Sequence, residues 1–157
     1  MKARFEQISP KPESSFTFLQ LSQPQFSLAY HFHPQLELTW IHKSAGKRFV
    51  GGNVSNYEEG DLVLVGSNTP HCWLGENDTS DDSAQAIVVQ FTTDFAGELF
   101  WEIPEMAQIK ALFQKATAGL QIFGQTRLQI VKILENCSAD QSFYKFVRLI
   151  EILHIIA

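Results

Sequence analysis

The chain has 157 residues, of which 45% are hydrophobic and 18% are charged. This length suits one compact domain with a hydrophobic core, and the composition excludes a disordered chain. The 12 basic residues are outnumbered by 17 acidic residues and are scattered along the sequence, so we expect this chain not to bind DNA by itself.

The first part of the chain is predicted to form short β-strands. Apolar and β-branched runs alternate there with turns that contain glycine or proline, a pattern typical of a jelly-roll barrel or sandwich. The predicted strands are 16–21, 26–32, 36–41, 48–50, 54–57, 62–65 and 84–91. The polar stretch 76–83 contains Glu76, Asp78, Asp81 and Asp82 and is predicted to be a solvated surface loop.

Beyond about residue 103 the apolar residues recur at helical spacing, which predicts three helices. Pro104 suits the first position of a helix, and Gly119 suits its end. Thr126 is predicted to cap the second helix. The third helix is expected to begin near Asp140 or Ser142.

The third helix carries two apolar stripes. One contains Phe143, Phe146, Val147, Ile150 and Leu153, and the other contains Leu149, Ile152 and Ile156. A surface helix of a monomer needs only one apolar stripe, so we expect the second stripe to pair with another copy of the chain. The sequence also stops without a glycine cap or a polar tail, which we interpret as a truncation within a longer protein.

The sequence contains no internal repeat, low-complexity tract or linker. We therefore predict a mainly β single domain over residues 1–157, with a barrel over 1–103 and an antiparallel helical segment over 104–157. No apolar run reaches the roughly 18 residues of a membrane-spanning helix. Cys72 and Cys137 fit no disulfide or metal-knuckle spacing. These features favour a reduced, cytoplasmic protein without membrane contact.

Three histidines and one glutamate form the main candidate site. Strand alternation places His31, His33 and Glu37 on one face. His71 follows another apolar strand and a turn, and is expected to meet them. Imidazoles with a carboxylate suit a first-row divalent metal, and we expect zinc or nickel. The alternative is a buried polar network that holds no metal.

The same residues resemble the two cupin motifs. His31-x-His33-x-x-x-Glu37 looks like the first motif, and the stretch from Gly60 through Asn68 to His71 looks like the second. The match departs from the cupin pattern at Gly66 and Asn68, at the spacing of Gly46, and at Gly75. A narrower resemblance, to the sensor domains of AraC-type regulators, rests on 31–38, 48–51, 60–73, 119–124 and 149–157.

The resemblance implies a cupin-like double-stranded β-helix (jelly-roll) barrel. It also implies a homodimer through the C-terminal helices, and helix-turn-helix units that this chain lacks. We thus expect an effector-sensing and dimerisation domain of a transcription factor, which responds to a small metabolite such as a sugar and is not an enzyme. The alternatives are a metal-dependent cupin isomerase or dioxygenase that uses the same four residues, and a bare dimerisation scaffold.

Other aromatic and sulfur-containing residues near the motif have less specific roles. Trp73 lies two residues after His71, so both are expected on the same face of a strand. Trp73 is predicted to bind the effector, with a core role as the alternative. Trp40 is predicted to be core, and Cys72 to be structural because adjacent strand residues face opposite ways. His42 and His154 are predicted to be solvent or packing residues.

Overall fold

The computed structural model describes residues 2–9, 11–27, 29–76, 84–137 and 139–157. The predicted acidic loop at 76–83 falls almost entirely outside them. The strands are β1 (Arg4–Phe5), β2 (Phe16–Gln23), β3 (His31–Phe32), β4 (Leu36–Lys43), β5 (Gly46–Val50), β6 (Asn53–Tyr57), β7 (Leu62–Val65), β8 (His71–Gly75), β9 (Ala84–Phe91) and β10 (Leu120–Gln121). The helices are the 3₁₀ turns η1 (Glu98–Glu102), η2 (Pro104–Met106) and η3 (Ala116–Ala118), and α1 (Ala107–Lys115), α2 (Gly124–Cys137) and α3 (Ser142–Ile156).

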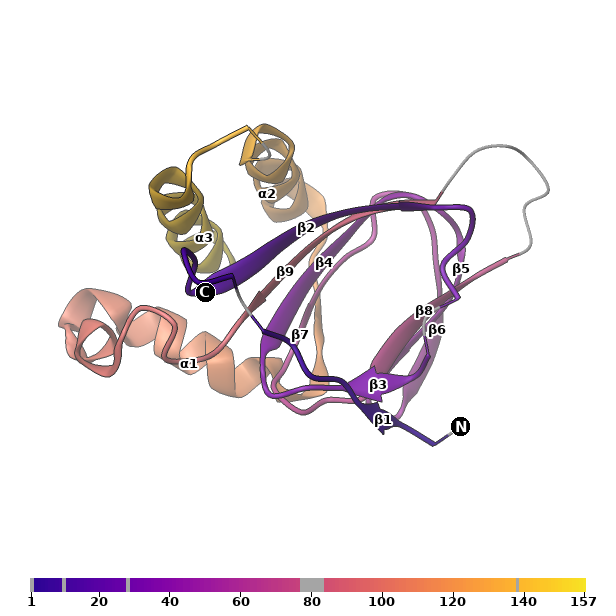
Figure 1. Cartoon of the computed structure of the whole chain (residues 1–157), viewed down its shortest axis with the longest axis horizontal. Coiled ribbons are helices and arrows are strands. Elements are labelled where there is room, and N and C mark those ends of the chain that lie inside the picture. Colours follow the sequence, from indigo (N-terminus) through magenta and orange to yellow (C-terminus); the bar gives the residue numbers. More distant parts are fainter. Residues whose placement is uncertain (1, 10, 28, 77–83, 138) are drawn as a thin grey trace.

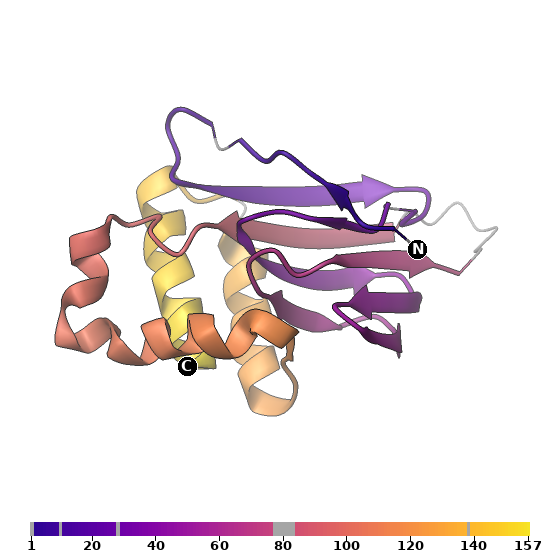
Figure 2. The ribbon, with the colours of Figure 1, turned by 90° about the horizontal axis from the view of Figure 1, so that it is seen from below.

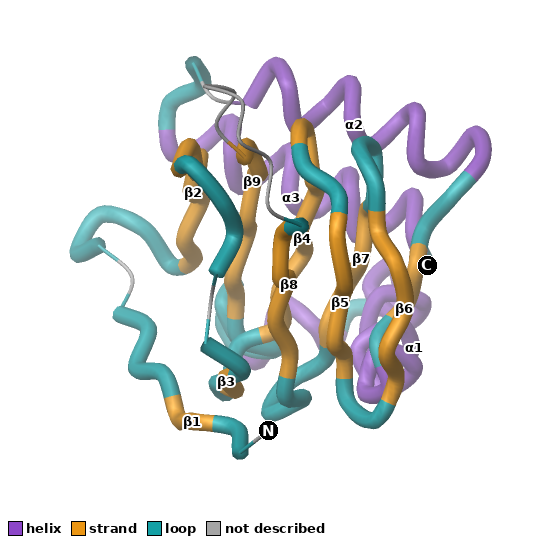
Figure 3. Tube along the Cα trace, turned by 90° about the vertical axis from the view of Figure 1, so that its right-hand side faces the viewer, coloured by secondary structure: helices purple, strands orange, loops and turns teal. Residues whose placement is uncertain are grey.

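Two five-stranded sheets face each other, and helices cover the outer side of one of them (Figures 1 and 2). The strand order is β1-β3-β8-β5-β6 in one sheet and β10-β7-β4-β9-β2 in the other. Figure 3 shows the first sheet in front and the helices behind the second. Among the described residues, hydrogen bonds join the strands into these two sheets rather than into one closed ring.

The central strands of the helix-covered sheet, β7, β4 and β9, are buried on both faces. In β4, Leu38 and Trp40 pack toward the helices, while Ile41 belongs to the core between the two sheets. In β7, Leu64 likewise packs toward the helices, and Val63 belongs to the core between the two sheets. This alternation explains why these strands are nearly continuous apolar runs, as expected for a sheet covered on both sides.

The predicted strand 26–32 is wrong in extent. Among the described residues of this stretch, His31–Phe32 alone forms a strand, and Ser27 makes an isolated bridge to Leu74. The structure also adds β1, β8 and β10, which were not among the predicted runs. The short added strands β1 and β10 pair at sheet edges, where little sequence pattern is needed to hold two residues.

A buried ion pair ties several strands together. The guanidinium of Arg48 on β5 contacts both carboxylate oxygens of Asp61 at 2.5 Å. Arg48 also donates to Ser55 Oγ at 3.1 Å, and Gln121 Nε2 donates to Asp61 Oδ1 at 3.1 Å. Both charges are thus hydrogen-bonded inside the fold, which is the condition under which a buried ion pair persists.

The helices pack on the sheet, but α3 presents different faces from those predicted. Leu149, Ile152 and Leu153 are buried in the core that the helices share with β4, β7 and β9. The predicted pairing stripe of Leu149 and Ile152 is therefore wrong, because the chain's own domain covers it. Phe143 and Val147, predicted to face the domain, are exposed. A helix that is apolar on two sides does not reveal from its spacing which side faces the core.

Among the described residues, no helix has both the length and the apolar character needed to cross a membrane.

Candidate ligand and metal site

The four predicted residues converge between the two sheets. His31 belongs to β3, His33 lies between β3 and β4, Glu37 belongs to β4, and His71 begins β8. One potential ligand atom from each lies within 4.8 Å of those of the others. The His71 ring centroid is 4.3 Å from that of His31 and 5.0 Å from that of His33. The predicted convergence is present, and it arises because β3 pairs with β8 at His31 and His71.

All three imidazoles are held in the same tautomer. The Nδ1 atoms of His31, His33 and His71 contact the backbone oxygens of Ala29 (2.8 Å), Gln35 (3.1 Å) and Thr69 (2.8 Å). A carbonyl oxygen only accepts, so each Nδ1 carries the hydrogen. Each neutral ring therefore offers a bare Nε2, the arrangement in which histidine binds a metal.

The Glu37 carboxylate lies beside the Nε2 atoms of His33 and His71. Its carboxylate oxygens are 3.2 Å from His33 Nε2 and 3.5 Å from His71 Nε2. Thr39 Oγ1 donates to Oε1 at 2.7 Å, and Gln90 Nε2 donates to Oε2 at 2.9 Å. The Nε2 of His71 is buried and has no hydrogen-bond partner in the described part of the chain. Lone pairs facing a carboxylate repel it unless a proton or a cation lies between them, so the donor set fits a divalent metal.

The pKa shifts in the cluster follow from this geometry. Burial alone would raise the pKa of Glu37, but the adjacent His33, His71 and Gln90 outweigh it and hold that pKa well below its usual range. Burial lowers the pKa of His71, but Glu37 outweighs burial and the pKa is raised. Burial and the neighbouring His71 lower the pKa of His31. Glu37 therefore loses its proton more readily than an ordinary carboxyl group, because its pKa is lowered, and His71 holds a proton more tightly than an ordinary imidazole, because its pKa is raised.

The metal-free protein should therefore be most stable in mildly acidic solution. The low pKa of Glu37 stabilises the fold above its ordinary value of 4.5, and this contribution is lost as the pH falls. The raised pKa of His71 stabilises the fold below its ordinary value of 6.5, and this contribution is lost as the pH rises through the raised value. Each group changes the free energy of unfolding by at most about 1.4 kcal/mol per pH unit.

Urea titrations in a chelator between pH 3 and 9 would measure this dependence. Glu37→Gln should weaken the pH dependence of the free energy of unfolding on both the acidic and the basic side. The Glu37 carboxyl group is itself the group with the lowered pKa, and it causes the raised pKa of His71. Glu135→Gln, which changes an exposed carboxylate on α2, is the matched control and should leave the curve unchanged. Identical curves for Glu37→Gln and the wild type would contradict the assignment.

A cavity of about 540 Å³ opens beside the cluster. This volume is in the range of sites for small organic ligands. Its wall combines polar groups at the cluster with apolar side chains from β2 and β9. The lining residues are Arg4, Phe5, Glu6, Gln7, Leu19, Leu21, Ala29, His31, Glu37, Trp73, Val88 and Gln90. At the mouth, Glu6 Oε2 lies 3.1 Å from His31 Nε2.

The other predicted residues are placed as follows. Trp73 is buried, lines the cavity, and has its ring centroid 5.9 Å from that of His71. Trp40 is core, on the helix side of the sheet. Cys72 is buried, and burial raises the pKa of its thiol, which makes it a poor nucleophile at neutral pH. His42 and His154 are exposed and outside the cluster.

Sequence reasoning did not identify Thr39, Gln90 and Glu6 as parts of the site. Signals for the first two were present. Thr39 has the same strand parity as Glu37, and Gln90 is a polar residue in the apolar second half of β9, directly opposite Glu37. A lone amide in a strand buried on both faces needs a buried partner. Glu6 had no such signal, because β1 is only two residues long.

No family model and no curated protein matches the chain. Solved structures do match. An apo ToxT variant from Vibrio cholerae strain SCE256 has a TM-score of 0.58 and 17% identity, over 90% of this chain and 54% of that chain. Wild-type ToxT with a bound unsaturated fatty acid, from the same strain, has a TM-score of 0.58 and 15% identity, over 90% of this chain and 51% of that chain. A cupin 2 conserved barrel domain protein from Salinispora arenicola CNS-205 has a TM-score of 0.43 and 17% identity, over 57% of this chain and 76% of that chain.

The chain has the fold of the matched part of ToxT. It spans about half the length of the ToxT chains that it matches. The mainly β fold that the sequence resemblance predicted is confirmed.

Proposed function

We propose that this chain is the effector-sensing domain of an AraC-type transcription regulator. The observation that carries the proposal is the cavity beside the histidine cluster, in a fold shared with ToxT, a regulator of that family. DNA contact is then made by residues of the parent protein other than these, because this chain has a net charge of −5 without a basic cluster.

The cavity favours an amphiphilic effector. Leu19, Leu21 and Val88 form an apolar wall, whereas the polar groups gather at the cluster and the mouth. A sugar presents hydroxyls on all sides and would leave many of them against that wall without partners. We therefore propose a small molecule with a polar or anionic head and a short apolar body, in place of the sugar expected from the sequence. A fatty acid bound to ToxT supports this chemistry.

Zinc or nickel bound by His31, His33, Glu37 and His71 is part of the proposal. The fixed tautomers and the unpartnered Nε2 of His71 support it. The metal would supply a positive charge that attracts the head of the effector. Thr39 and Gln90 hold the Glu37 carboxylate in place, and Trp73 offers an aromatic face to the bound molecule.

A metal-dependent enzyme is the second candidate, and the same ligand set favours it. Catalysis would also need an acid or base that is not itself a ligand. Glu6, 3.1 Å from His31 at the cavity mouth, is the side chain placed for that role. Turnover of a bound molecule by the zinc-loaded protein would favour the enzyme, and unchanged recovery of that molecule would favour the sensor.

A thermal-shift screen tests the sensor proposal. We expect short aliphatic carboxylates to raise the melting temperature, and sugars to leave it unchanged. A ligand at one hundred times its Kd stabilises by about 2.7 kcal/mol, which is roughly 5–10 °C for a domain of this size. Leu19→Trp should abolish the shift, because Leu19 lines the cavity and is 40% exposed, so the larger ring fits without disturbing the core.

The matched control for that screen is Leu99→Trp. Leu99 is 85% exposed and lies in η1, away from the cavity lining. This variant should respond to carboxylates as the wild type does. A shift that survives Leu19→Trp would place the ligand elsewhere, and a shift produced by sugars alone would overturn the amphiphilic effector.

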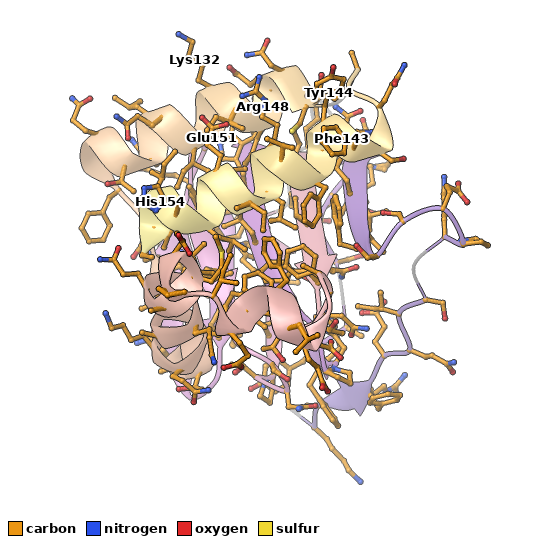
Figure 4. All side chains as sticks on the ribbon, turned by 90° about the vertical axis from the view of Figure 1, so that its left-hand side faces the viewer. Lys132, Phe143, Tyr144, Arg148, Glu151 and His154 are labelled. Atoms are coloured by element: carbon orange, nitrogen blue, oxygen red, sulfur yellow. The ribbon has the colours of Figure 1, made fainter. Side chains whose placement is uncertain are left out.

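We also propose a homodimer through the outer face of α3. Figure 4 shows Phe143, Tyr144, Arg148 and Glu151 along this side of the helix. Phe143 and Tyr144 are 69% and 58% exposed, and Arg148 pairs with Glu151 at 2.9 Å. The face thus carries apolar groups with charges of both signs, which makes it self-complementary under a two-fold axis. A second copy of this chain is the partner that it fits.

A further inference from the structure

The turn between β7 and β8, residues 66–70, makes hydrogen bonds that keep His33 and His71, two of the four cluster residues, in place. The backbone oxygen of Thr69 accepts the Nδ1 hydrogen of His71 at 2.8 Å. The amide of Asn68 donates to the backbone oxygen of His33 at 2.8 Å. Asn68 has a φ of +56°, a left-handed conformation that asparagine tolerates better than most residues. The conformation of this turn therefore fixes the positions of both histidines.

The other side of the same turn contacts the helical segment. The Thr69 hydroxyl donates to the backbone oxygen of Thr117 in η3 at 2.8 Å. A Cβ added at Gly66 would lie 2.5 Å from the backbone oxygen of Ala116, so the two backbones are in direct contact there. The amide of Gly119 donates to the oxygen of Ala116 at 2.8 Å, and β10 then leads into α2. We call residues 116–119 the junction between α1 and β10.

We propose that Thr69 is a positioning residue that couples occupancy of the histidine cluster to this junction. Its backbone oxygen orients His71, and its hydroxyl anchors Thr117; the residue is only 7% exposed. The inference rests on the proposed function, because it requires that the cluster binds a ligand. The inference adds that Thr69 connects the site to the helices through these two hydrogen bonds.

The coupling follows from thermodynamic linkage between ligand binding at the cluster and opening of the turn. Opening of the turn displaces His71 and His33 and so destroys the ligand set. A ligand bound to the closed cluster therefore reduces the open population by the factor 1 + [L]/Kd, about 100-fold at a concentration one hundred times Kd. Since the Thr69 hydroxyl joins the junction to the turn, the junction opens with the turn and is stabilised with it.

The helices that flank the junction give the coupling a function. α1 is the helix before residues 116–119, α2 is the next α-helix after them, and both pack against α3. A change in the stability of the junction is thus transmitted to the helical layer, whose outer face is the proposed interface between two copies.

Amide exchange measured by NMR, with and without zinc chloride at one hundred times its Kd, tests the proposal. In the wild type, zinc should slow exchange at Asn68 and at Gly119 by about 100-fold. In Thr69→Val, zinc should still slow exchange at Asn68 but leave Gly119 unchanged. Thr69→Ser, which keeps the hydroxyl, should restore the effect at Gly119.

The matched control is Thr117→Val. This change removes the bond from Thr117 Oγ1 to the Gln114 oxygen (3.1 Å) but keeps the backbone oxygen that Thr69 contacts, so zinc should act as in the wild type. Slowing at Asn68 without slowing at Gly119 in the wild-type protein overturns the coupling and leaves the site intact. Equal slowing at Gly119 in Thr69→Val also overturns it. No heat of zinc binding in calorimetry overturns both the metal site and the coupling.

Discussion

Replacing Ile152 with glutamate should unfold the domain, whereas replacing Val147 with glutamate should leave the fold intact and separate a dimer into monomers. Ile152 is 1% exposed within the core that the helices share with the sheet. The glutamate would leave a cavity and bury an unpaired charge, at a cost above about 4 kcal/mol. That is a large part of the 5–15 kcal/mol by which a domain is typically stable.

Val147 lies on the outer face of α3 and is 43% exposed. A glutamate there stays in water in the monomer, but it would bring like charges together across a two-fold interface. Light scattering at micromolar concentration, with circular dichroism melts, distinguishes the two results. Leu99→Glu, on an exposed residue of η1, is the control and should change neither mass nor stability. A monomeric wild-type protein would contradict the proposed interface.

Zinc affinity should fall most strongly when a direct ligand is removed. His71→Ala takes away a buried Nε2 that has no hydrogen-bond partner among the described residues. Gln90→Leu removes only the amide that donates to Glu37 at 2.9 Å. Changes in such supporting contacts typically cost 10–100-fold in metal affinity, so we expect about that loss for Gln90→Leu and a larger loss for His71→Ala.

Calorimetry with zinc, on protein purified without immobilised nickel, measures both losses. His42→Ala is the control, because His42 is exposed near the end of β4 and outside the cluster. Its affinity should equal that of the wild type. Equal affinities for all four proteins would show that zinc binds at another place and that the cluster is a polar network.

The strands that form the core were predictable from the sequence because their pattern is local. The runs 62–65 and 84–91 appear in the structure with the predicted bounds. The convergence of His31, Glu37 and His71 was predicted, but not for the reason given by strand parity. His31 lies on β3 and Glu37 on β4, and these two strands belong to different sheets. Residues 33–35 connect the two sheets, and the sheets face each other, which brings His31 and Glu37 together.

The remaining features depend on pairing between distant segments. Residues 26–30 have the composition of a strand, but of those that the structure describes only Ser27 forms a bridge. Composition alone therefore overestimated the strand. The pairing of β8 with β3 and β5 brings together residues far apart in sequence. The faces of α3 were assigned incorrectly, because Leu149 and Val147 are equally apolar and only tertiary packing distinguishes them.

β4 has a consequence for how this domain can diversify. Glu37 and Thr39 face the cluster, and Leu38 and Trp40 face the helices. Deleting one residue within the strand would exchange the two sets, placing a carboxylate in the helical core and leucine at the site. Relatives should therefore alter effector preference by point substitution at alternate positions of this strand. Changes in length should be confined to turns such as Ser44 and Ala45, where neither set is displaced.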